Sequence, residues 1–166
     1  MTRPRYSKVA TGGTFDGLHA GHKRLLERSF ELGEEVIIGL TSDEFARKAG
    51  KAPARSYEKR RDALMAFIGD SFPGRRYLIA KLDDLFGPGI ASADVKALVA
   101  SPETAKRVGL ANEMRAKRGF PPLDLAVVDW VVAEDGEPIS STRIRNGEID
   151  EEGKLVETSK NGAKAK

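Results

Sequence analysis

The sequence predicts an α/β fold, a Rossmann-like, doubly wound parallel five-stranded sheet in a single domain. Short apolar runs alternate along the chain with amphipathic segments of helical length. Such segments return the chain across a sheet in right-handed crossovers, which makes neighbouring strands parallel. The length of 166 residues, with 40% hydrophobic and 32% charged side chains, suits one domain with a sizeable core. We expect this domain to span residues 1–155, followed by a flexible basic tail at 156–166.

Five apolar runs are the expected strands of this sheet. The first, KVATG, and the second, VIIGLT, are apolar enough to be buried. The expected strands lie at residues 8–12, 36–41, 76–81, 97–100 and 125–132.

The amphipathic segments between these runs are the expected helices. Ser42 and Ser56 stand where N-caps are needed, and Gly33 is the expected stop of the first helix. The expected helices lie at residues 22–32, 43–49, 57–69, 102–118 and 140–145. In the helix at 57–69 we expect an inner face made of Leu64, Met65, Phe67 and Ile68.

The composition excludes several classes of function. The chain has no cysteine, which removes disulfides, thiolate chemistry and the usual zinc frameworks. Its net charge is only +3, and no basic patch interleaved with aromatic residues indicates nucleic-acid binding. The first residues lack the apolar core of a signal peptide, and no window approaches a membrane span. We therefore expect a cytoplasmic protein that contacts neither membranes nor nucleic acid.

The stretch GGTFDGLHAGHKRLL, residues 12–26, contains both histidines of the chain. It follows the first expected strand and enters the first expected helix. It therefore lies at the carboxyl edge of the sheet, where doubly wound folds bind ligands. The stretch is not a Walker A loop, because Leu18 follows Gly17 where a lysine is needed, and it lacks the G-x-G-x-x-G fingerprint of dinucleotide sites.

The residue types in this stretch favour a phosphate site. Gly12 and Gly13 let the backbone approach a ligand, and the N–H groups at a helix start attract anions. His19 and His22 add side-chain donors of adjustable protonation. One alternative is a turn with two surface-capping histidines. The other is a zinc site, for which Asp16 would have to join the pair because no third histidine exists.

A second candidate motif lies late in the chain, in ISSTRIRNGEID, residues 139–150. Its hydroxyl groups open an expected helical turn and can donate to phosphate oxygens, while Arg143 or Arg145 can balance the phosphate charge. The alternative is an ordinary Ser/Thr N-cap with exposed arginines. The hydroxyl residues are Ser140, Ser141 and Thr142.

Together the two motifs resemble those of the nucleotidyltransferase superfamily. His19, Gly21 and His22 match its H-x-G-H signature, and ISSTRIR resembles its I-S-S-T-x-x-R motif. Within the superfamily, the stretch GGTFDGLHAGH, with its doubled glycine, resembles the corresponding motif of phosphopantetheine adenylyltransferases of the archaeal and eukaryotic type.

Two later stretches support this narrower resemblance, and one departs from it. The loop DDLFGPG, with Asp83 or Asp84 before Gly87, and SPET at residues 101–104 are both similar to that family. The stretch AKRVGL at residues 105–110 departs from the glycine-bearing turn expected there.

The resemblance implies transfer of AMP from ATP to 4′-phosphopantetheine, which gives dephospho-coenzyme A and pyrophosphate. Two alternatives stay open. One is another transferase of the superfamily, such as an FAD synthetase, a nicotinamide-mononucleotide adenylyltransferase or a cytidylyltransferase, and the other is a nucleotide-binding protein without turnover. The implied cofactor is Mg²⁺, held mainly by the phosphates of ATP. Coenzyme A is a candidate inhibitor, and a monomer or a small homo-oligomer is the expected assembly.

The resemblance also implies roles for individual residues. The expected catalytic residues are His19, His22, Lys48 and Thr14, and the acceptor is expected to contact Thr14, Lys48 and Lys51. The two histidines would donate to phosphate oxygens as negative charge builds. The residues expected to bind ATP are Gly12, Gly13, Phe15, Asp16, Gly21, Ser101, Glu103, Asn112, Arg115, Ser140, Ser141, Thr142 and Arg143.

Overall fold

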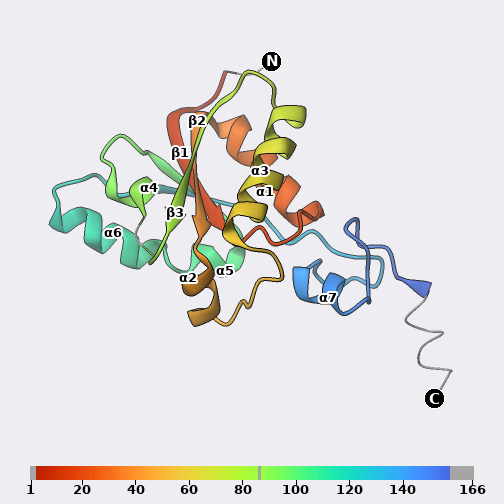
Figure 1. The fold of residues 1–166 in the computed structure, drawn as a ribbon. Coiled ribbons are helices and arrows are strands. Elements are labelled where there is room, and N and C mark those ends of the chain that lie inside the picture. Colours follow the sequence, from red (N-terminus) through yellow and green to blue (C-terminus); the bar gives the residue numbers. More distant parts are fainter. Residues whose placement is uncertain (1–2, 86, 158–166) are drawn as a thin grey trace.

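The computed structural model, which describes residues 3–85 and 87–157, confirms the predicted fold class. Five strands form one parallel sheet in the order β3-β2-β1-β4-β5 (Figure 1). The order reverses at β1, so the carboxyl ends of β1 and β4 meet at the switch point where such sheets bind ligands. The strands are β1 (Tyr6–Gly13), β2 (Gly33–Thr41), β3 (Arg76–Leu82), β4 (Ala97–Ala100) and β5 (Asp124–Val127).

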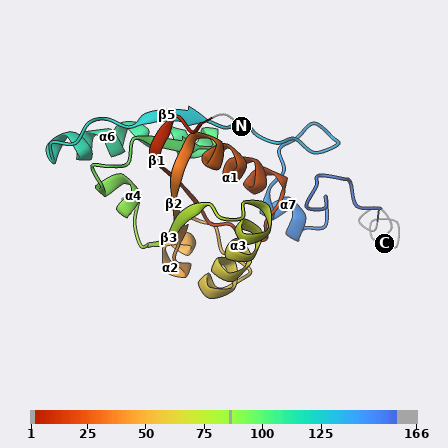
Figure 2. The same cartoon turned by 90° about the horizontal axis from the view of Figure 1, so that it is seen from above.

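Helices cover both faces of the sheet (Figure 2). Two of them, α1 and α3, bury Leu26 and Leu64 in a large apolar cluster on one face. On the other face, Ile90 of α4 and Val108 of α6 pack against a smaller cluster that contains Leu98. The helices are α1 (Ala20–Leu32), α2 (Asp43–Lys48), α3 (Tyr57–Ser71), α4 (Pro88–Ala91), α5 (Pro102–Ala105), α6 (Val108–Lys117) and α7 (Ser141–Arg145).

The first crossover is tighter than predicted. α1 begins at Ala20, before the predicted residue 22, because His19 serves as its N-cap. At the other end, the N–H of Gly33 donates to the carbonyl of Ser29 and so caps the helix. Gly33 is also the first residue of β2, where it pairs with Tyr6. The connection between α1 and β2 therefore contains no loop residue.

The inner face of α3 differs from the prediction at Met65. Leu64 and Ile68 are buried as expected and Phe67 is partly buried against the same cluster, but Met65 is 46% exposed. The buried positions recur every three or four residues from Tyr57, and Arg60 occupies the second of them with no exposed surface. An arginine thus lies where a helix of this kind usually places an apolar side chain.

The strand predicted at 125–132 is too long. β5 is an edge strand whose neighbour, β4, supplies pairing partners only from Ala97 to Ala100, so β5 ends at Val127. Further along the chain, Val132 makes an isolated antiparallel bridge to Pro138.

The helix predicted at 102–118 is two helices. α5 ends at Ala105, and α6 begins at Val108 with Arg107 in the N-cap position. The loop after β3 also contains the short helix α4, which the sequence analysis does not predict. In the described residues no helix has the length and hydropathy needed to cross a membrane. Residues 158–166 of the predicted tail lie outside the described residues.

Candidate active site

The stretch GGTFDGLHAGH connects the carboxyl end of β1 to the start of α1, as predicted. Its backbone turns at Phe15, which has a φ of 49° and whose side chain is buried. The Phe15 ring lies 5.1 Å from the ring of His22, measured between centroids. The loop therefore brings the second histidine back over the end of the strand.

The two histidines form the N-cap of α1 together. The Nδ1 atom of His19 accepts hydrogen bonds from the backbone N–H groups of Gly21, at 3.0 Å, and His22, at 3.4 Å. In return, Nδ1 of His22 accepts from the N–H of His19 at 3.4 Å, which completes a capping box. Because both Nδ1 atoms are acceptors, each neutral imidazole carries its proton on Nε2.

The pair is packed closely, and Gly21 makes this possible. The two imidazole rings stack with 3.7 Å between centroids. A Cβ on Gly21 would lie 2.8 Å from Cε1 of His19, too close for any side chain to be tolerated without displacing that ring. The H-x-G-H spacing therefore has a local structural reason.

Both imidazoles are neutral at neutral pH. Burial, followed by the positive charge of Lys23, lowers the pKa of His19 to about 4. Burial, followed by repulsion from His19, lowers the pKa of His22 to about 3, although a hydrogen bond to the backbone of Gly17 opposes this shift. The site thus holds two neutral N–H donors rather than two cations.

These pKa values predict how stability depends on pH. Because the folded-state pKa values of His19 and His22 lie below the ordinary value of 6.5, the unfolded chain binds more protons in the interval between them. We expect the free energy of unfolding to fall as the pH drops from 6.5 towards 4. Urea titrations of the wild type and of a double variant with His19→Asn and His22→Asn measure it. If the two pH profiles are parallel below pH 6.5, the histidines do not have these pKa values.

Asp16 joins this loop to two distant segments. Its buried carboxylate accepts from the backbone N–H groups of Ala54, at 2.8 Å, and Arg55, at 3.2 Å. It also accepts from the guanidinium of Arg145 in α7 at 2.9 Å. The second predicted motif is therefore brought against the first, and Asp16, which is predicted to bind ATP, links the two.

The structure distinguishes the two arginines of the second motif. Arg143 pairs with Asp135 and, at 3.3 Å, with Glu148, so its guanidinium is engaged by carboxylates of its own segment. Arg145 is the arginine that reaches the loop containing His19. Arg145 was an open option in the sequence, and its contact with Asp16 makes it the better candidate for a phosphate ligand.

The predicted hydroxyl residues surround the start of α7. Ser140 is the N-cap, and its hydroxyl accepts from the N–H of Arg143 at 3.2 Å. Ser141 is the first residue of the helix, and Thr142 accepts from the Arg145 guanidinium at 3.4 Å. Both the capping role and a phosphate-binding role are compatible with this arrangement, since the hydroxyl protons of Ser140 and Thr142 are not used in these bonds.

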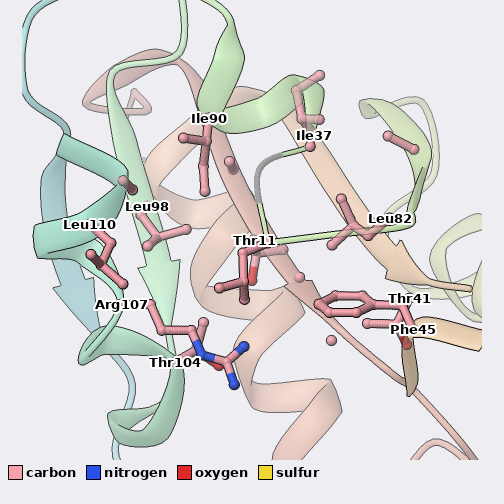
Figure 3. A pocket seen from close by; sticks show the side chains of 18 residues that line it. Thr11, Ile37, Thr41, Phe45, Leu82, Ile90, Leu98, Thr104, Arg107 and Leu110 are labelled. Atoms are coloured by element: carbon pink, nitrogen blue, oxygen red, sulfur yellow. The ribbon is translucent and has the colours of Figure 1, made fainter. Parts of the chain in front are cut away.

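A pocket of about 120 Å³ opens on the face of the sheet that α4 and α6 cover (Figure 3). Its floor is made of small or apolar side chains from β1, β2 and β3, and it continues to the carboxyl ends of these strands. Arg107 is the one charged residue among its described lining residues, and its guanidinium reaches into the opening opposite Phe45. The backbone of Gly12 and Gly13 lines the pocket and leads directly into the loop that carries the histidines.

Comparison with known proteins now identifies the family. The cytidylyltransferase-like family matches residues 10–147. The chain belongs to this family. It is 44% identical to the phosphopantetheine adenylyltransferase of Methanopyrus kandleri, over 89% of this chain and 93% of that protein. It is 46% identical to the protein of the same name from Methanosarcina acetivorans, over 89% and 95%. The resemblance stated from the motifs is thereby confirmed.

Solved structures agree with this assignment. A protein of unknown function from Archaeoglobus fulgidus is 32% identical, covers 74% of this chain and 89% of its own, and superposes with a TM-score of 0.67. A protein from Thermoplasma volcanium described as a lipopolysaccharide core biosynthesis protein has a TM-score of 0.58 at 22% identity, over 73% of this chain and 94% of that chain, which supports the fold alone.

In this member of the cytidylyltransferase-like family, Thr14 is held by a residue that the sequence analysis missed. Arg60 donates to the backbone carbonyls of Thr14 and Thr41, each at 2.9 Å, and to the carboxylate of Asp43 at 2.7 Å. The hydroxyl of Thr41 in turn donates to the hydroxyl of Thr14 at 3.2 Å. Arg60 therefore fixes the ends of β1 and β2 next to each other, and no motif in the sequence signals this role.

Of the two predicted lysines, Lys48 is the last residue of α2 and Lys51 lies in the loop that follows. Lys48 is exposed and pairs with Glu44 one helical turn away, at 3.2 Å. Lys51 pairs across space with Glu103 of α5 at 3.5 Å. The second contact brings two predicted site residues together over the carboxyl edge of the sheet, whereas the structure leaves Lys48 on the surface beside Phe45.

Two residues predicted to bind ATP have other partners. The side chain of Asn112 accepts from the N–H of Leu123 at 2.8 Å. Arg115 is 1% exposed, and its guanidinium donates hydrogen bonds to backbone carbonyls. These belong to Ile90, Ser92, Val95 and Pro121, at 2.8 to 3.0 Å. Both side chains hold loops together and are not brought to the histidines. Ser101 caps α5 by accepting from the N–H of Thr104 and stays at the carboxyl edge.

The donor set does not favour a resident metal. Within residues 3–85 and 87–157, no three His, Asp or Glu side chains are grouped closely enough to hold a metal ion. The zinc alternative would need both histidines as ligands through Nε2, which requires the ring proton on Nδ1, but both Nδ1 atoms accept hydrogen bonds in the helix cap. Asp16 is engaged by backbone N–H groups and Arg145.

Proposed function

We propose that this chain transfers AMP from ATP to 4′-phosphopantetheine, giving dephospho-coenzyme A and pyrophosphate. The observation that carries the proposal is the capping box of His19 and His22, which presents two neutral N–H donors at the start of a helix. The names of the archaeal relatives, at 44% and 46% identity over most of the chain, support the choice of acceptor. The apolar pocket with Arg107 at its opening suits an acceptor with an uncharged arm and a phosphate.

The chemistry explains why the site has donors but no activated nucleophile. The attacking group is a phosphate monoester, which is already anionic near neutral pH, so no general base or covalent enzyme intermediate is needed. The reaction depends on placing the acceptor in line with the α-phosphate and on stabilising the charge that develops there. Neutral imidazoles suit this task because they donate hydrogen bonds without having to lose a proton during the reaction.

The described residues can be assigned to these tasks. His19 and His22 donate to oxygens of the α- and β-phosphates, and the backbone around Thr14, held by Arg60, receives the phosphate of the acceptor. The hydroxyl groups at the start of α7 bind the β- and γ-phosphates. Arg145 exchanges Asp16 for the triphosphate when ATP enters.

Mg²⁺ fits this scheme as a companion of ATP. The chain offers no carboxylate cluster for it in the described residues, so the phosphates would supply most of its ligands. Bound there, the ion would supply further neutralisation of the triphosphate charge.

An acceptor screen tests the proposal. The protein is incubated with ATP and Mg²⁺ and, separately, with 4′-phosphopantetheine, FMN and nicotinamide mononucleotide, with CTP in place of ATP as a further arm. We expect pyrophosphate release that depends on ATP and 4′-phosphopantetheine together. Pyrophosphate release only with a different acceptor, or only when CTP replaces ATP, would indicate the activity of another member of the superfamily. Nucleotide binding without release in any arm would indicate a protein without turnover.

A further inference from the structure

Arg107 reaches the pocket from the turn between α5 and α6. The turn between α5 and α6 interrupts the single helix that the sequence predicts, and Arg107 is the N-cap residue of α6. It lies in AKRVGL, the stretch that departs from the glycine-bearing turn. α5 follows β4, the neighbour of β1, so this turn and the histidine loop lie at the same edge of the sheet.

The surroundings of Arg107 differ from those of the other arginines near the site. Arg60, Arg115 and Arg145 are all engaged by carboxylates or carbonyls of the chain itself. The guanidinium of Arg107 makes no hydrogen bond or ion pair with the residues that the structure describes. The nearby carboxylate of Glu103 is paired with Lys51 instead. A cation without a counter-ion thus reaches into an opening that is otherwise lined by apolar and small residues.

Figure 3 shows where this cation lies. The guanidinium extends from the α5–α6 turn into the space between Thr104 and Phe45. Deeper in the pocket the lining includes the apolar side chains of Leu98 and Ile90, which offer a ligand no charged group. A ligand that fills this pocket therefore meets apolar contacts along its length and a single positive group at the opening.

We propose that Arg107 is a specificity residue for the acceptor, which it recognises by its phosphate monoester. A planar guanidinium can bind two phosphate oxygens at once, and such charge-assisted pairs are stronger than neutral hydrogen bonds. Arg107 selects the phosphorylated arm over the same arm without phosphate, and it presents that phosphate at the edge where the histidines hold ATP. This inference rests on the proposed function, because it takes 4′-phosphopantetheine as the acceptor.

The test compares Arg107→Ala with Lys106→Ala, a matched control in which the neighbouring exposed cation outside the pocket lining is removed. Pyrophosphate release is measured while each substrate is varied in turn. We expect Arg107→Ala to raise the KM for 4′-phosphopantetheine about tenfold or more, as for a lost charge-assisted bond. The KM for ATP and kcat should stay within about twofold of the wild type. Arg107→Lys should recover part of the loss, because it keeps the charge without the paired donors.

A binding measurement separates phosphate recognition from a general loss of fit. Calorimetry compares the affinities of 4′-phosphopantetheine and pantetheine for each variant. We expect the preference for the phosphorylated arm to be large in the wild type and in Lys106→Ala, and to shrink about tenfold in Arg107→Ala. An unchanged preference, or a rise in the KM for ATP instead, would overturn the assignment of Arg107 while leaving the proposed function intact. If the wild type neither binds nor uses 4′-phosphopantetheine, both the function and this inference are wrong.

Discussion

Replacing His22 by alanine is expected to lower kcat by about 100-fold or more, as the loss of a preorganised transition-state donor does in other enzymes. In the proposed mechanism the Nε2–H of His22 donates to a phosphate oxygen whose negative charge grows during the reaction. The KM for ATP should change less than kcat, because the bond strengthens as the charge develops. Pyrophosphate release under saturating ATP and 4′-phosphopantetheine measures the effect.

The capping box makes a second substitution informative. His22 also accepts from the N–H of His19, so His22→Ala removes part of the helix cap along with the donor. An asparagine reaches the position of Nδ1 but not that of Nε2. His22→Asn should therefore be as inactive as His22→Ala while unfolding at a higher urea concentration. Arg28→Ala, which removes an exposed ion pair with Glu31 in the same helix, is the control and should retain activity. Near-normal kcat in both His22 variants would exclude the donor role.

Replacing Arg115 by methionine is expected to destabilise the fold by about 3 kcal/mol or more. The guanidinium joins the carbonyls of Ile90, Ser92 and Val95, before β4, to that of Pro121, before β5. Without it these acceptors lose a charged donor, and the buried ones have no water to replace it. Arg118→Met removes an exposed arginine at the end of the same helix and should leave the free energy of unfolding nearly unchanged.

The same variant decides between two roles for Arg115. The family resemblance implies contact with ATP, whereas the hydrogen bonds indicate a structural role. If the structural role is right, folded Arg115→Met at low temperature should bind ATP with nearly the wild-type affinity. A large rise in the Kd for ATP, with unfolding unchanged, would instead support contact with the nucleotide.

Much of the fold could be predicted from the sequence because local patterns determine it. The buried strands are apolar runs, and the helix starts at Ser42, Ser56 and the histidine pair carry their own caps. The length of β5 could not be predicted in this way. Its apolar run continues past Val127, but the number of hydrogen-bonding partners is set by β4, which is distant in sequence.

In the candidate site, too, residues with partners nearby in the sequence could be predicted, and residues with distant partners could not. The histidine pair was predictable because its two residues are only three positions apart in the sequence and contact each other at the start of one helix. Arg60 and Arg145 were harder to assign, since their partners Thr14 and Asp16 lie far away in the chain. An arginine on a helix usually faces solvent, and only the folded chain shows which carbonyl or carboxylate needs a donor.

Because no loop residue separates α1 from β2, the length of α1 determines where the helix begins. Gly33 ends the helix and begins the strand, and a Cβ there would lie 2.7 Å from a methyl group of Val9. The far end of α1 is thus fixed against the sheet, and the position of His19 is set by the 13 residues of the helix. Inserting one residue within α1 would advance its start by about 1.5 Å and turn it by about 100°. The number of residues in α1 therefore helps to set where the two histidines lie relative to the carboxyl edge of the sheet.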